Sequence, residues 1–137
     1  MKRKVTAIVL ICLFLMTSGV AYASDYGIMP CYNVVSMANC AIASEDDGVL
    51  MNIWVCAPDT TSLDKVSVTV KLKRSSGVTA ATITKNAVKQ GNVFYFDVTE
   101  DVTVSGTYHF EYTAKCYKNN VLVDTVTGTS ASIAHTV

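Results

Sequence analysis

The chain has 137 residues, with 11 Lys+Arg, 11 Asp+Glu, five cysteines and only two prolines. This length suits a single domain with a buried core. The absence of a Gly/Ser-rich linker and of an internal repeat argues against a division into several domains or repeats.

The N-terminus has the pattern of a secretory signal peptide. Basic Lys2, Arg3 and Lys4 precede the apolar run 5–16, and Ala21-Tyr22-Ala23 matches the A-x-A cleavage pattern. The apolar run is shorter than the ~20 residues of a membrane-spanning helix, so no retained anchor is expected. Bulky residues before Cys12 argue against a lipid attachment site. The sequence therefore predicts a Sec signal peptide over 1–23, cleavage after Ala23, and release outside the cell.

Cleavage changes the charge of the predicted mature chain, Ser24 to Val137. It keeps 8 Lys+Arg against 11 Asp+Glu, a formal charge of −3. Such a mildly acidic composition gives no electrostatic reason to expect nucleic acid or an anionic membrane as a partner. After cleavage, no second apolar span remains that would insert into a membrane.

The first half of the mature chain predicts a hairpin. Residues 26–37 are irregular or a weak first strand, and Glu45-Asp46-Asp47-Gly48 is a turn between strands 39–44 and 49–57. Pairing across this turn sets Ile42 opposite Met51. Alternation then buries one face and turns the other outward. The buried face holds Met51, Ile53, Val55 and Ala57, and the outward face holds Leu50, Trp54 and Cys56.

Three further strands follow. Residues 65–74 alternate strictly, with valines and Leu72 on one face and lysines, Ser and Thr on the other. Ser75-Ser76-Gly77 is a turn, 78–84 is a Thr/Ala-rich edge strand, and 92–98 places Phe94 and Phe96 on one face with Tyr95 on the reverse.

The segment 105–133 predicts two long antiparallel strands closed by Asn119-Asn120. Asn tolerates positive φ, so this pair suits a type I′ turn. On the first strand one face is aromatic and apolar, so we expect it to be buried; it consists of Tyr108, Phe110, Tyr112, Ala114 and Cys116.

About seven strands, with turn signals every 8–14 residues, predict an all-β fold, an antiparallel β-sandwich after the signal helix. The strand order resembles that of immunoglobulin domains, and Ser105-Gly106-Thr107-Tyr108 resembles their tyrosine corner. Immunoglobulin domains place a Cys two residues after that Tyr, and this chain has Phe110 there. The central inter-sheet disulfide of those domains is therefore not expected.

The mature chain as a whole also resembles small secreted β-sandwich proteins of Gram-positive bacteria, most of which have no assigned activity. The resemblance implies a fold and an extracellular location. It rests on Pro30…Tyr32, Met37-Ala38-Asn39-x-x-Ile42, Val68-x-Val70-x-Leu72-Lys73-Arg74 and Gly106-x-Tyr108.

Four cysteines remain in the mature chain, and an even number in an exported protein predicts two disulfides. Their spacing lacks the short knuckles of zinc sites, so no metal is expected. Side-chain parity favours Cys40–Cys116 with Cys31–Cys56. The rival pairing, Cys56–Cys116 with Cys31–Cys40, requires a bulge that turns Cys56 inward.

Signals for catalysis are weak, and we expect neither an enzyme nor a cofactor. His109 falls on an outward face beside Glu111, and His135 lies close to the C-terminus, where order is least expected. No nucleophile, zinc or phosphate motif is present. The acidic turn 45–47 lacks the alternating spacing of a calcium loop, which leaves calcium binding open against a solvated turn.

Two functions follow as hypotheses. The first is a non-catalytic secreted module that binds a protein or a cell-envelope component through a sheet face or a strand edge. The second is a carbohydrate-binding module, which needs coplanar exposed aromatics. The expected binding surface is Leu50, Trp54, Tyr95 and Tyr117, with the Thr-rich last strand as a further candidate. The oligomeric state stays open.

Overall fold

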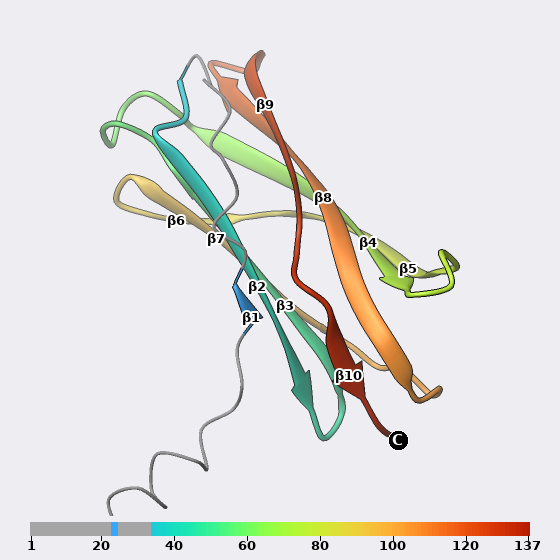
Figure 1. The fold of residues 1–137 in the computed structure, drawn as a ribbon. Coiled ribbons are helices and arrows are strands. Elements are labelled where there is room, and N and C mark those ends of the chain that lie inside the picture. Colours follow the sequence, from blue (N-terminus) through green and yellow to red (C-terminus); the bar gives the residue numbers. More distant parts are fainter. Residues whose placement is uncertain (1–22, 25–33) are drawn as a thin grey trace, which may run out of the picture.

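The computed structural model describes residues 23–24 and 34–137, which form strands and turns without a helix. Most of the predicted signal peptide, and Cys31, lie outside these residues. Figure 1 shows the fold, whose strands are β1 (Ala23–Ser24), β2 (Met37–Glu45), β3 (Gly48–Cys56), β4 (Lys65–Arg74), β5 (Thr79–Asn86), β6 (Val88–Gln90), β7 (Val93–Glu100), β8 (Gly106–Lys118), β9 (Val121–Thr129) and β10 (Ile133–His135).

The strands form two antiparallel sheets packed face to face (Figure 1). The first sheet has the order β1-β2-β3-β7-β6. In the second, β5 pairs with β4 and β4 with β8, while β9 and β10 pair with different parts of β8. Seven of the described strands have eight residues or more. The predicted all-β sandwich of about seven strands is confirmed.

The order of the seven long strands is immunoglobulin-like with one change. The first, second and fifth (β2, β3 and β7) share a sheet, and the sixth and seventh (β8 and β9) join the third (β4) in the other. In an immunoglobulin constant domain the fourth strand belongs to the first group. Here the fourth long strand, β5, pairs with β4 and so widens the second sheet.

A hydrogen bond at the start of β8 has the geometry of a tyrosine corner. The Tyr108 hydroxyl donates to the Val104 carbonyl oxygen at 2.6 Å, four residues upstream. This is the bond that anchors the entry to the sixth strand in immunoglobulin-like sandwiches. Because the tyrosine ring is fully buried, the bond also satisfies a polar atom at the edge of the core.

The core lies between the inward faces of β2, β3, β4, β7 and β8. Met51 lies opposite Ile42, as the predicted register requires. The predicted inward stripe of β8 is buried along its whole length, and it belongs to one core cluster with the valines of β4 and with Phe94 and Phe96 of β7. Period-2 alternation thus predicted both the buried and the outward faces correctly.

The turns also agree with their sequence signals. Asn119 and Asn120 have φ values of 49° and 62°, as a type I′ turn requires. Gly48 follows the acidic turn at φ 153°, and it lies directly against the backbone of Glu100 and Asp101. A side chain at position 48 would therefore meet the neighbouring strand.

Three short strands, β1, β6 and β10, were not predicted. After β5, Ala87 donates its N–H to the Val66 carbonyl oxygen at 2.9 Å, and the chain then crosses to the first sheet as β6. Because β6 is three exposed residues long, it has no alternation to detect. Residues 133–135 form β10 beside the start of β8, so the predicted disorder near His135 was wrong.

Replacing Gly48 by Ala is expected to destabilise the fold by about 3 kcal/mol or more, because the new methyl group meets backbone atoms that cannot rotate away. Gly77→Ala is the matched control. Gly77 has φ +87° but open space around it, so the expected loss is only about 1 kcal/mol from backbone strain. Urea denaturation monitored by circular dichroism measures both. Equal losses in the two variants would contradict the close approach at Gly48.

Candidate functional site

The outward face of β3 and β7 brings two predicted site residues together. Trp54 and Tyr95 are directly opposite each other in the β3–β7 register, and both are half-buried. Directly opposite side chains have Cβ atoms about 5 Å apart, so the two aromatic rings form one surface. We call Trp54 and Tyr95 the aromatic pair.

Leu50 lies on the same face as the aromatic pair but further along β3. Asn52 separates it from Trp54, and the Asn52 amide donates a hydrogen bond to Asp97 of β7. Four residues of strand correspond to about 13 Å. Leu50 is therefore part of the same face, although a polar Asn52–Asp97 step divides it from the aromatic rings.

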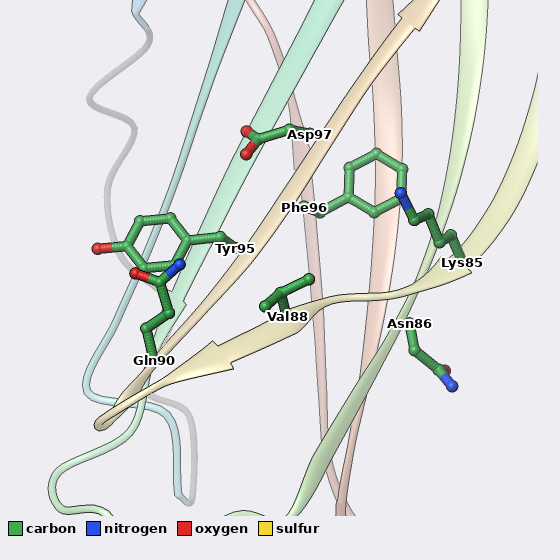
Figure 2. A pocket seen from close by; sticks show the side chains of 7 residues that line it. All are labelled: Lys85, Asn86, Val88, Gln90, Tyr95, Phe96 and Asp97. Atoms are coloured by element: carbon green, nitrogen blue, oxygen red, sulfur yellow. The ribbon is translucent and has the colours of Figure 1, made fainter.

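A shallow depression of about 480 Å³ adjoins the aromatic pair, where the chain crosses from β5 to β6 beside β7 (Figure 2). Figure 2 shows Tyr95, Gln90 and Asp97 on one side of β7, and Phe96 on the other side. The lining combines aromatic rings with a carboxylate, two amides and an amine; it consists of Lys85, Asn86, Val88, Gln90, Tyr95, Phe96 and Asp97.

Sequence reasoning named Tyr95 but missed the rest of this depression. The depression depends on the position of β6, which pairs only with residues 93–95 of β7. On that side of β7, the pairing therefore ends at the depression. The depression forms because the chain crosses from β5 to β6 after Asn86. The direction of that crossing is not encoded in a local sequence pattern.

Tyr117 does not join the aromatic pair. It lies on the outward face of the second sheet, opposite Lys65, whose ammonium group is 4.5 Å from the centre of the tyrosine ring. Such a contact is a cation–π interaction. Of the three aromatics expected to be coplanar, Trp54 and Tyr95 therefore lie on the first sheet and Tyr117 lies on the second.

The cysteines differ from the expected arrangement. Among the described residues, no disulfide joins Cys40, Cys56 and Cys116 to one another. The Cys40 sulfur lies 3.8 Å from the carbonyl oxygen of Thr129, which pairs with Glu111 on β8. Cys116 is five residues further along that strand, about 17 Å away.

A disulfide needs Cα atoms about 4.4–6.8 Å apart, so the predicted Cys40–Cys116 bridge is absent for a geometric reason. The alternation of side chains correctly predicted that Cys40 and Cys116 point inward. It does not predict how far along its strand each cysteine lies. The rival Cys56–Cys116 bridge is absent as well, because Cys56 keeps its outward, half-buried position. Cys31–Cys56 stays a prediction, since Cys31 lies outside the described residues.

The two histidines have different surroundings. His109 lies on the outward face opposite Lys73, and the Lys73 ammonium binds Glu111 at 2.8 Å. The hydrogen bond from Lys73 lowers the pKa of the Glu111 carboxyl group. Glu111 is thus held in an ion pair with Lys73.

His135 is only 3% exposed, and its Nδ1 lies 2.8 Å from the Ser44 hydroxyl oxygen. Its ring also packs edge-on against Tyr108, with 6.4 Å between ring centres. These contacts tie β10 to β2 and to the tyrosine corner. This serine–histidine contact lies at the β2–β10 margin, across the sandwich from the depression beside β7.

The acidic turn at residues 45–47 is part of an acidic end of the first sheet. Glu45 accepts a hydrogen bond from the Thr99 hydroxyl at 3.1 Å, and Asp46 and Asp47 are exposed. In the described part of the chain, no three His, Cys, Asp or Glu side chains converge to hold a metal ion. Nor does any helix long and apolar enough to cross a membrane occur there.

Comparison of the chain with protein-family models, with curated proteins and with solved structures found no match. The resemblance to small secreted proteins of Gram-positive bacteria therefore stays a sequence-based prediction. The fold and the geometry of its surfaces carry the functional argument.

Cys116 is expected to escape alkylation by iodoacetamide at about pH 8 in the native protein and to react once the protein is denatured. Burial, with a further contribution from the charge of Asp124, raises the pKa of the Cys116 thiol to about 12, so little reactive thiolate forms. Peptide mapping by mass spectrometry, with and without reduction, measures this. Half-buried Cys56 in the reduced sample is the internal control. Rapid native labelling of Cys116, or its recovery in a disulfide, would contradict the structure.

Proposed function

We propose that this chain is an exported, non-catalytic binding module that acts outside the cell. The signal-peptide pattern at residues 1–23 supports export. The single observation that supports binding most directly is the aromatic pair of Trp54 and Tyr95, which lies beside a depression at an open strand edge. The partner in this proposal is a protein or a cell-envelope component.

Aromatic residues are suited to this role. Trp and Tyr are enriched among the residues that contribute most to binding, because their rigid rings bury a large area at little entropic cost. Asn52 and Asp97, beside the pair, supply hydrogen-bonding groups that would orient a partner. The first sheet thus offers two aromatic rings with polar groups directly beside them.

The non-catalytic part of the proposal rests on how the titratable groups are used. Glu111 is paired with Lys73, and His135 is buried against Ser44 and Tyr108, away from the depression. Nucleophilic catalysis requires a base that is itself oriented by a third group at an accessible cleft. A binding role requires no such arrangement of catalytic groups.

A carbohydrate ligand is the second candidate, and the depression is the observation that favours it. Sugars are bound by aromatic faces together with planar amides and carboxylates that exchange hydrogen bonds with hydroxyl groups. Tyr95, Gln90, Asn86 and Asp97 supply these groups within one depression. Tyr117 is on the other sheet, so the carbohydrate hypothesis now rests on Trp54 and Tyr95 without it.

The double variant Trp54→Ala/Tyr95→Ala is expected to lose binding to cell-envelope fractions by at least about tenfold, because both anchors of the surface are removed. Co-sedimentation of the purified mature protein with envelope fractions measures the affinity. Tyr117→Ala is the matched control, since it removes an aromatic ring from the opposite sheet. Circular dichroism checks that each variant is folded.

Competition with soluble oligosaccharides released from the same envelope separates the two candidates. Full competition identifies a carbohydrate ligand, and lack of competition with retained dependence on the aromatic pair identifies a protein. If the double variant binds as tightly as the wild type, or if Tyr117→Ala loses as much, the first sheet is not the binding surface.

A further inference from the structure

Most basic residues of the domain lie on the second sheet. Strands β2, β3 and β7 contain no Lys or Arg, and the acids Glu45, Asp97 and Glu100 lie on them. In contrast, seven of the eight basic residues after position 24 lie on β4, β5 and β8: Lys65, Lys71, Lys73, Arg74, Lys85, Lys115 and Lys118. The low net charge of the chain hides this separation.

The outward face of the second sheet is polar and basic. It carries Lys65, Lys71, Lys73 and Lys115 against a single acid, Glu111. We call it the lysine face. Most of its remaining positions are hydroxyl residues, so the described strands place no large apolar side chain at its centre.

A row of four threonines crosses the middle of the lysine face. The register aligns one threonine from each of β9, β8, β4 and β5, and the Thr69 and Thr84 hydroxyl groups are 2.9 Å apart. Adjacent strands lie about 4.8 Å apart, so the row extends about 14 Å across the sheet. It consists of Thr127, Thr113, Thr69 and Thr84.

The lysines flank this row on both sides. Lys115 lies opposite Ser67 on one side, and Lys71 lies opposite Glu111 on the other. The strand geometry places the Cα atoms of Lys71 and Lys115 about 14 Å apart. Lys73 is bound by Glu111 and Lys65 packs on Tyr117, whereas Lys71 and Lys115 are exposed.

From this arrangement we infer that the lysine face binds a linear anionic polysaccharide, with Lys71 and Lys115 contacting separate anionic groups and the threonine row bonding sugar hydroxyls between them. A single small anion reaches one lysine at a time, but a polymer with repeated charges reaches both. Linking two weak contacts in one ligand raises the affinity through effective concentration. This site is independent of the aromatic pair on the first sheet.

Two other occupants fit the face less well. A membrane surface is bound through apolar side chains that enter the lipid as well as through charge, and the centre of the lysine face offers only polar groups. In a second copy of the chain, the outward face of β3 and β7 carries Leu50, Trp54 and Tyr95, and these would be set against threonines and lysines. A hydroxylated polyanion satisfies both the charges and the hydroxyl groups.

The test uses the mature protein and heparin as a sulfated polysaccharide, with polygalacturonate as a carboxylate polymer and dextran as a neutral control. Isothermal titration calorimetry at low and physiological salt is expected to show binding to one or both polyanions that weakens as salt rises. No binding to dextran is expected. A heparin disaccharide should bind at least about tenfold more weakly than the polymer.

Variants assign the site. Lys71→Gln/Lys115→Gln is expected to weaken polymer binding by about tenfold or more, because it removes two positive charges from the lysine face. Glu111→Gln is expected to strengthen binding, because it removes a negative charge from the same face. Thr103→Glu/Val137→Glu lowers the net charge by the same amount at exposed positions off this face, so it should change the affinity less than threefold. Trp54→Ala/Tyr95→Ala should leave it unchanged, which keeps this site distinguishable from the proposed binding surface.

Several results would overturn the inference. These are equal binding to dextran, equal losses in the lysine variant and its charge-matched control, and tighter binding to anionic vesicles or to DNA than to the polysaccharides. Binding of the disaccharide as tightly as the polymer would also contradict a site that spans the threonine row.

Discussion

Burial of the inward stripe of β8 is the constraint on which the structure depends. Tyr108, Phe110 and Tyr112, with Ala114 and Cys116, lie between the two sheets along a strand of 13 residues. A one-residue slip of this strand would expose all five side chains and bury Glu111 and Lys115 in their place. The register of β4 and β9 against β8 follows from that cost. The Tyr108–Val104 hydrogen bond and the Asn119–Asn120 turn fix the two ends of the same strand.

This constraint also determines what each sheet shows to the solvent. Once the inward faces are fixed, alternation leaves Leu50 and the aromatic pair on the outside of the first sheet, and the lysines and threonines on the outside of the second. The two outer faces then differ in chemistry: one combines aromatic rings with acids, and the other combines hydroxyl groups with amines. A chain with little net charge therefore presents two surfaces of different chemistry, which the net charge alone does not show.

The fold was predictable from the sequence, whereas the site was predictable only in part. Strand positions, the Ile42–Met51 register and the buried stripe of β8 follow from local alternation and turn chemistry, which act over a few residues. Three features depend on contacts between distant segments, and local patterns do not encode them. The height of Cys40 relative to Cys116 excludes their disulfide, the crossing at Ala87 creates the depression beside Tyr95, and the pairing of β10 with β8 buries His135.

We propose that the outward face of β3 and β7 binds the partner. Trp54 is the only tryptophan in the chain, so its fluorescence reports on this face without any added label. The most direct measurement is a titration of the mature protein with soluble envelope fragments while Trp54 emission and its quenching by acrylamide are recorded. We expect a saturable blue shift and reduced quenching, with both weakened in Tyr95→Ala. Saturable binding, detected independently, that leaves Trp54 emission and quenching unchanged would contradict it.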